Sequence, residues 1–163
     1  MTPPYRVGDE LPPLEIPVTR TLIVAGAIAS RDYQDVHHDA ASAREKGSPD
    51  IFMNILTTNG LVGRYITDHF GPTAVLRKVA IRLGAPNYPG DVLRLTGRIT
   101  ELRTADASSA DTSSADASSE EVVDAVEAIE AVVQVTGGNG IGRHVTGTVA
   151  VTLPEPSAER AGA

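Results

Sequence analysis

An aspartate and a histidine in one polar segment, Asp32 and His37 within residues 30–39, are the residues of this chain best suited to proton transfer. A regular helix would place them on different faces, whereas a curled loop can bring both within reach of one water molecule. A carboxylate and a neutral imidazole that share a water can polarise it and return a proton from the same side. Addition of water across a double bond conjugated to a carbonyl group requires this chemistry. The pair therefore predicts a site that moves protons at a carbonyl compound.

An apolar stretch after this segment predicts a long, mostly buried helix from Ile51 to about Phe70. Asp50 is expected to be its N-cap, and Gly71 is expected to end it. The free N–H groups at the start of the helix, aided by the helix dipole, could bind an oxygen on which negative charge develops. Loop and helix together supply a proton-transfer pair and an oxyanion donor.

Simpler readings of the histidines stay open. An Asp and a His this close in sequence more often form a loop hydrogen bond than a catalytic pair. His37, His38 and Asp39 are metal-binding residue types, but adjacent histidines point apart and no third ligand is obvious, so no metal is expected. His69 is expected to interact with the end of the helix dipole, and His144 is expected to lie on a strand surface.

Composition and periodicity predict the remaining elements of the chain. Residues 1–20 contain several prolines and predict an extended lead-in without ladder hydrogen bonds. The run 21–29 is apolar on both faces and predicts a buried central strand, and residues 40–46 predict a short helix. Further strands are predicted at 74–83, 92–100, from about 126 and at 144–153, the first two as a hairpin.

This order of elements predicts an α+β fold in which an antiparallel sheet wraps around one helix, the hot-dog architecture. A generic α+β sheet protein is the alternative. The domain is expected to span residues 21–153, with a low-complexity, mobile loop at 104–120 and a flexible tail at 154–163.

Composition excludes several classes of function. The 163 residues suffice for one domain, and 14 basic against 21 acidic side chains give a net charge of −7, which argues against nucleic-acid binding. No cysteine is present, so disulfides and thiol catalysis are excluded. No apolar stretch reaches the roughly 20 residues that span a bilayer, so no membrane contact and a cytoplasmic location are expected.

The segment Asp32-Tyr-Gln-Asp-Val-His37-His-Asp39 resembles the motif of the MaoC-like (R)-specific enoyl-CoA hydratases, which usually reads Gly-Asp-x-Asn-Pro-Ile-His-x-Asp. On this match Asp32 and His37 take the catalytic positions. Gln34 stands where asparagine is usual and implies a substrate-binding role, and Arg31 replaces the usual glycine.

A second part of the resemblance lies at the expected helix start. Residues 51–57 are similar to the family's Ile-x-His-Gly-Met-Leu-Thr, which puts Met53 and Asn54 at the His and Gly positions beside the substrate. The backbone N–H of Asn54 could still donate to the thioester oxygen. Arg82 begins a segment similar to the strand and turn after the helix. It is a candidate for binding the CoA phosphates, as are Arg77, Lys78 and Arg94, although each could equally lie on a solvated strand face.

The same segments resemble the small subunits of heteromeric steroid enoyl-CoA hydratases in actinobacterial cholesterol side-chain degradation. That resemblance implies hydration of 3-oxo-4,17-pregnadiene-20-carboxyl-CoA to its 17-hydroxy product, with no cofactor beyond the CoA of the substrate. It also implies a heterotetramer with a second MaoC-like subunit, through which a thiolase-like aldolase docks. The alternatives are an acyl-CoA thioesterase on the same fold and a non-catalytic structural subunit.

Overall fold

The computed structural model describes residues 5–105 and 128–153. Most of the predicted low-complexity loop and the whole predicted tail lie outside these ranges. The elements follow in the order β1 (Glu10–Pro17), α1 (Arg20–Ala29), the 3-10 helix η1 (Asp35–His37), α2 (Ala40–Glu45), α3 (Ile55–Phe70), β2 (Val75–Leu83), β3 (Val92–Ala105), β4 (Ala128–Gly138) and β5 (Arg143–Leu153).

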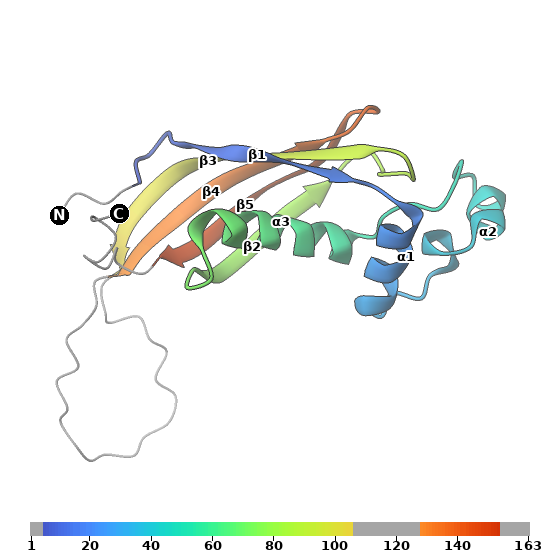
Figure 1. Cartoon of the computed structure of the whole chain (residues 1–163), viewed down its shortest axis with the longest axis horizontal. Coiled ribbons are helices and arrows are strands. Elements are labelled where there is room, and N and C mark those ends of the chain that lie inside the picture. The colour runs from blue at the N-terminus through green and yellow to red at the C-terminus, as the bar shows by residue number, and fades with distance from the viewer. Residues whose placement is uncertain (1–4, 106–127, 154–163) are drawn as a thin grey trace, which may run out of the picture.

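One antiparallel sheet with the order β1-β3-β4-β5-β2 forms the body of the molecule. It curves over α3, while α1 and α2 lie beyond the N-terminal end of α3 (Figure 1). The predicted α+β architecture, a sheet around a long helix, is therefore confirmed.

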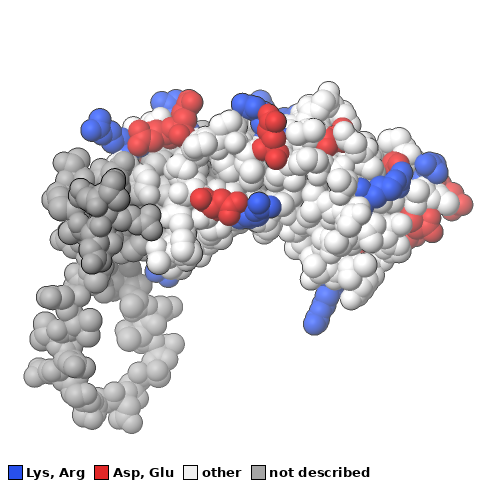
Figure 2. All heavy atoms as spheres, in the orientation of Figure 1, with Lys and Arg blue, Asp and Glu red and all other residues white. Residues whose placement is uncertain are grey.

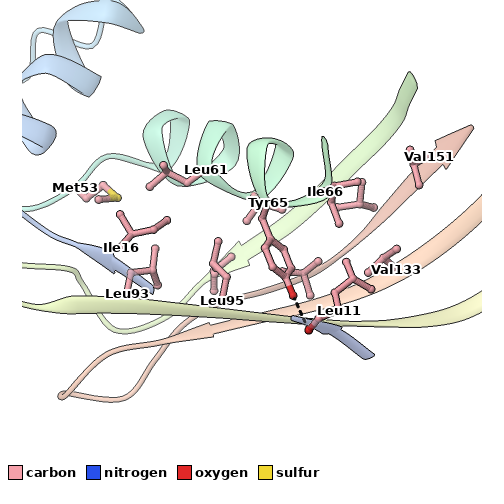
Figure 3. Packing of buried hydrophobic residues seen from close by; sticks show 14 of the residues in the cluster. Leu11, Ile16, Met53, Leu61, Tyr65, Ile66, Leu93, Leu95, Val133 and Val151 are labelled. Atoms are coloured by element: carbon pink, nitrogen blue, oxygen red, sulfur yellow. Dashed lines mark hydrogen bonds between the residues drawn. The ribbon is translucent and has the colours of Figure 1, made fainter. Parts of the chain in front are cut away.

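The core lies between α3 and the concave face of the sheet (Figure 3). Ile66 of α3 and Leu95 of β3 are both fully buried in it. Tyr65 is 3% exposed, and its hydroxyl donates a 3.3 Å hydrogen bond to the carbonyl of Leu11 on β1. Burial raises the pKa of Tyr65 to about 12, so the hydroxyl stays a donor and ties the helix to the edge strand.

The long helix begins four residues later than predicted, at Ile55 with Asn54 as N-cap rather than at Ile51 with Asp50. Asn54 Oδ1 accepts a 2.9 Å hydrogen bond from the Thr57 N–H, which satisfies one of the free donors of the first turn. The N–H of Met53 is bonded to a carbonyl of another loop, so this stretch is not helical. The end at Gly71, with φ 94°, is as predicted.

The apolar run predicted as the central strand is helix α1, which corrects that interpretation. Thr19 caps it through a 3.0 Å bond from the Leu22 N–H to its Oγ1. Ile23 and Ala27, four residues apart, are its buried residues, as a helix face requires. At Gly26 the helix lies so close to α3 that an added Cβ would overlap the Thr57 side chain.

Two predictions about the sheet are also wrong. Residues 10–17 are not a lead-in without ladder bonds but the edge strand β1, whose register shifts between Leu11 and Leu14, where Pro12 and Pro13 fall. β2 and β3 do not form a hairpin, because β2 pairs with β5 and β3 with β1 and β4.

The surface seen in Figure 2 carries basic and acidic side chains in small mixed groups between wide uncharged areas. Charges of opposite sign at such short spacing cancel at a distance, so the field over this face is weak. No helix of the described ranges is both long and apolar enough to cross a bilayer.

Candidate active site

Asp32 is placed by the way in which α1 ends. Ser30 is the C-cap, and Arg31 takes a left-handed conformation with φ 56°. The N–H groups of the two residues after the cap therefore donate hydrogen bonds back to carbonyls of the last helical turn. Arg31 N–H donates to Ile28 O at 3.0 Å, and Asp32 N–H donates to Ala27 O at 2.9 Å. This pair of bonds is the Schellman motif. The helix terminus itself therefore fixes the backbone of Asp32.

His37 ends the 3-10 helix η1 and is buried. Its Nδ1 lies 2.7 Å from the carbonyl oxygen of Phe52, and the two rings meet edge to face with centroids 5.0 Å apart. A carbonyl can only accept, so Nδ1 carries a hydrogen. In the neutral ring, Nε2 therefore presents a lone pair and is available as a base.

The predicted pair is brought together. Oδ2 of Asp32 lies 3.3 Å from Nε2 of His37, with the side chains 19% and 7% exposed. Oδ1 of Asp32 also accepts a 3.3 Å bond from the Gln34 N–H. The two side chains are thus largely shielded from bulk water, and their reactive atoms are close enough for both to contact one water molecule.

Asn54 is the third member of this cluster, and it is 2% exposed. Its Nδ2 donates to Oδ2 of Asp32 at 3.0 Å and to Oγ of Ser30 at 2.9 Å. The bond from Asn54 is the largest cause of a lowered pKa of Asp32; burial opposes it, and the Gln34 N–H and His37 add to it. Asp32 is therefore a carboxylate at neutral pH.

A pocket of about 330 Å³ opens over this cluster. All the predicted site residues except Arg82 line it: Asp32, Gln34, His37, Met53 and Asn54. Two other hollows lie on the outer face of β1, β3 and β4 and are larger, at about 360 and 480 Å³, but no histidine lines either of them. The pocket that contains the Asp32–His37 pair is therefore the candidate active site.

Arg82 lies outside the lining of this pocket and is exposed on β2, next to Leu83 of the pocket wall. Of the other basic residues considered for CoA, Arg94 is paired with Glu15 at 2.7 Å, and Arg77 donates to Thr152 Oγ1 at 2.8 Å. The structure thus groups five of the six predicted residues in one pocket, and Arg82 lies outside its lining.

The helix starts beside Asn54, the residue whose N–H the family resemblance implies as an oxyanion donor, and not near Ile51. Because the helix begins at Ile55, the residues near Ile51 are not part of its first turn. Within the described residues, the N–H of Asn54 forms no hydrogen bond, and Asn54 lines the pocket. The N–H is thus free to donate to a ligand.

His144 was predicted to be a surface residue, but it is 1% exposed and lines the pocket. Its Nδ1 lies 2.7 Å from Ala85 O, and its Nε2 lies 2.9 Å from Thr58 Oγ1. Burial lowers its pKa, although the Ala85 carbonyl and Asp91 oppose the effect. The alternation of polar and apolar residues along β5 could not reveal this burial. His144 is covered at the start of the strand by residues 84–85, which are distant in the sequence.

Among the described residues, no three His, Cys, Asp or Glu side chains are grouped as a metal site would require. His38, one of the residues considered for a metal, is exposed, with Nε2 3.3 Å from the Tyr33 carbonyl.

The chain is similar in sequence to a known hydratase subunit. No protein-family model matches the chain. The chain is 40% identical over 147 residues to the 3-oxo-4,17-pregnadiene-20-carboxyl-CoA hydratase beta subunit of Mycobacterium tuberculosis (strain ATCC 25618 / H37Rv), which covers 90% of this chain and 95% of that protein.

Solved structures show the same fold. A chain of the ChsH1-ChsH2 complex from Mycobacterium tuberculosis aligns with a TM-score of 0.73 at 38% identity, covering 94% of this chain and 99% of that one. The (R)-hydratase from A. caviae involved in PHA biosynthesis aligns with a TM-score of 0.71 at 18% identity, covering 93% of this chain and 98% of that one.

Proposed function

Because the chain belongs to the MaoC-like hydratase family, as a relative of a steroid-CoA hydratase beta subunit, we propose that it is a hydro-lyase subunit acting on an enoyl-CoA thioester. The proposed substrate is 3-oxo-4,17-pregnadiene-20-carboxyl-CoA, which gains water across its α,β double bond to give the 17-hydroxy product. The observation that carries the proposal is the 3.3 Å approach of Asp32 Oδ2 and His37 Nε2 in the pocket.

In the proposed reaction, a water bound to both residues loses a proton to Nε2 of His37 while its oxygen bonds to the β-carbon. The π electrons of the double bond move toward the thioester oxygen, where the Asn54 N–H stabilises the enolate. The proton then passes by way of Asp32 to the α-carbon. Transfer of this proton to the basic α-carbon of the enolate leaves His37 neutral and Asp32 as the carboxylate that its lowered pKa favours, so both residues return to their starting state.

Binding of the thioester is proposed to involve Gln34 and Met53, which line the pocket, and Arg82 outside it. Met53 is 2% exposed and offers an apolar, adaptable wall. Arg82 would meet the CoA phosphates once the rest of the binding cleft is completed by another subunit. The substrate supplies the activated double bond and the chain supplies the proton transfer, so no cofactor is needed.

We further propose that the active form contains a second MaoC-like subunit, two copies of each chain, because the related chain was solved in the ChsH1-ChsH2 complex. Docking of a thiolase-like aldolase through the partner subunit would pass the hydroxylated product to carbon–carbon cleavage. A cytoplasmic location, where CoA thioesters are made and used, completes the proposal.

The test is to assay this chain alone, the partner alone and the two together with the steroid enoyl-CoA thioester. We expect the mixture to give a product heavier by one water, detected by mass spectrometry, and no free CoA thiol. Release of free thiol without the hydrated product would instead identify a thioesterase. Full activity of the partner alone, unchanged when this chain is added, would identify a structural subunit and overturn the proposal.

A further inference from the structure

The side chain of Asn54 uses its hydrogen-bonding groups entirely inside the site. Nδ2 donates to Ser30 Oγ and Asp32 Oδ2, and Oδ1 accepts from the Thr57 N–H. Because the Thr57 N–H can only donate, the amide oxygen must face it, and this fixes the amide nitrogen toward Asp32. One buried amide thus connects the end of α1 with the start of α3, which lie side by side in Figure 1.

The orientation of Asp32 needs such a donor. Nδ1 of His37 holds the ring hydrogen against the Phe52 carbonyl, so a neutral His37 presents a lone pair to Oδ2 of Asp32. Two acceptors 3.3 Å apart repel one another and would turn the carboxylate away when no proton lies between them. The 3.0 Å bond from Asn54 to the same oxygen opposes this rotation.

We infer that the side chain of Asn54 is a positioning residue: its Nδ2 holds Oδ2 of Asp32 toward Nε2 of His37, in the geometry that shares one water. The inference rests on the proposed hydration for its kinetic readout. It concerns the side chain and is separate from the backbone N–H assigned to the thioester oxygen. The glycine that is usual at this position in the hydratase motif has no side chain to make this contact.

The surroundings of Asp32 make Asn54 the group whose loss should matter most. The uncharged Asn54, at the start of α3, contacts the Asp32 carboxylate directly. Ser30, at the end of α1, contacts only the Asn54 amide. The titratable group beside the carboxylate is His37 of η1. The Asn54 bond is also the largest cause of the lowered pKa of Asp32. Loss of the amide should therefore misorient the carboxylate and raise its pKa together.

Two substitutions separate this role from the helix cap, and both keep the backbone N–H. In Asn54→Asp a carboxylate oxygen can still cap α3, so folding should be retained, but the donor to Asp32 is replaced by a like charge. Asn54→Gly removes the side chain, and glycine is among the residues that helix N-caps tolerate, so folding should be retained here too. Ser30→Ala is the matched control, because it removes the other partner of Nδ2 and leaves the bond to Asp32.

With the reconstituted complex and the enoyl-CoA thioester, we expect both Asn54 variants to lower kcat by roughly 10- to 100-fold, with KM changed only a few-fold. The acid limb of the kcat profile should move to higher pH. Ser30→Ala should lose less activity than either variant and keep the wild-type acid limb. Wild-type kcat and pH profile in both Asn54 variants would overturn the inference.

A second measurement does not depend on the reaction. Carbon-13 NMR of the Asp32 carboxyl group gives its pKa in the wild-type chain and in Asn54→Gly. We expect a higher pKa in the variant whether or not the complex hydrates this substrate, so failure of the proposed function is distinguished from failure of the inference. An unchanged Asp32 pKa would overturn the positioning role.

Discussion

The imidazole of His37 is oriented by Phe52 rather than by Asp32: Nδ1 lies 2.7 Å from the Phe52 carbonyl, whereas Nε2 lies 3.3 Å from Oδ2 of Asp32. The ring should therefore keep its position when the carboxylate is changed. This arrangement separates the chemical role of each residue from its structural role and allows each to be tested alone.

We predict that Asp32→Asn and His37→Ala each lower the hydration rate by about 10²- to 10⁴-fold, the usual contribution of one acid–base group. Loss of the thioester-conjugated double bond can be followed spectroscopically. Circular dichroism and partner binding should match the wild type for Asp32→Asn. Retained hydration in both variants would remove these residues from the mechanism.

His144 gives a prediction for stability and its pH dependence. His144→Ala would leave Thr58 Oγ1 and Ala85 O without their buried partner, so we expect a loss of about 2–4 kcal/mol in the free energy of unfolding. Urea denaturation of wild type and variant measures this loss.

The pKa of His144 is lowered from 6.5 in the fold, so unfolding takes up a proton below that pH. Its contribution to stability should be complete above pH 6.5 and fall as pH decreases toward the lowered value. The stability difference between wild type and His144→Ala should therefore shrink between neutral pH and about pH 5.5. A difference that grows on acidification would contradict a neutral, buried His144.

Gly26 sets the distance between α1 and α3. A Cβ at this position would overlap Thr57 Oγ1 and lie 2.8 Å from Thr57 Cγ2. Overpacking of this kind costs about 1–3 kcal/mol, which exceeds the gain in helix propensity of about 1 kcal/mol from glycine to alanine. We predict that Gly26→Ala has a lower free energy of unfolding than the wild type. We also expect it to have a lower hydration rate, because the end of α1 fixes the backbone of Asp32.

Thr57→Ala supplies the control for this clash. Adding it to Gly26→Ala should recover part of the lost stability, since the two overlapping atoms beyond Cβ are removed. A double-mutant cycle by urea unfolding measures the coupling. Strictly additive effects would show that the two helices do not meet at these residues.

Arg31 has φ 56° at the position next to Asp32, a conformation that glycine adopts without strain. We predict that Arg31→Gly is tolerated, with stability within about 1 kcal/mol of the wild type, and that the β-branched Arg31→Val loses about 1–2 kcal/mol and most activity. Thermal unfolding and the hydration assay check both variants. Equal stability and equal activity of Arg31→Gly and Arg31→Val would show that the left-handed backbone at this position is not required.

The sequence was informative where a signal is local. The helix at 55–70 could be predicted because its apolar residues recur at helical spacing up to Gly71. The approach of Asp32 and His37 could be predicted because both lie in one short segment, so no distant contact is needed to bring them together. The run 21–29 was interpreted as a strand because its apolar and small residues fit a buried strand as well as the helix α1 that they form.

Distant contacts explain the remaining errors. The alternation of apolar and polar residues identifies β2 as a strand. It does not show that β2 pairs with β5, which lies about 70 residues further along the chain. His144 was placed on the surface for the same reason, because its cover comes from Ala85 and Thr58. Asn54 was predicted for its backbone N–H, while the bonds of its side chain depend on Ser30 and Asp32 more than 20 residues earlier.

The two edges of the sheet differ in a way that limits how copies can associate. β1 lacks amide hydrogens at Pro12, Pro13 and Pro17, whereas every residue of β2 has one. A strand from another molecule could therefore extend the sheet beside β2 but would meet interrupted donors beside β1. A molecule with one receptive edge can pair only once through its sheet, so this asymmetry disfavours open-ended growth of the sheet.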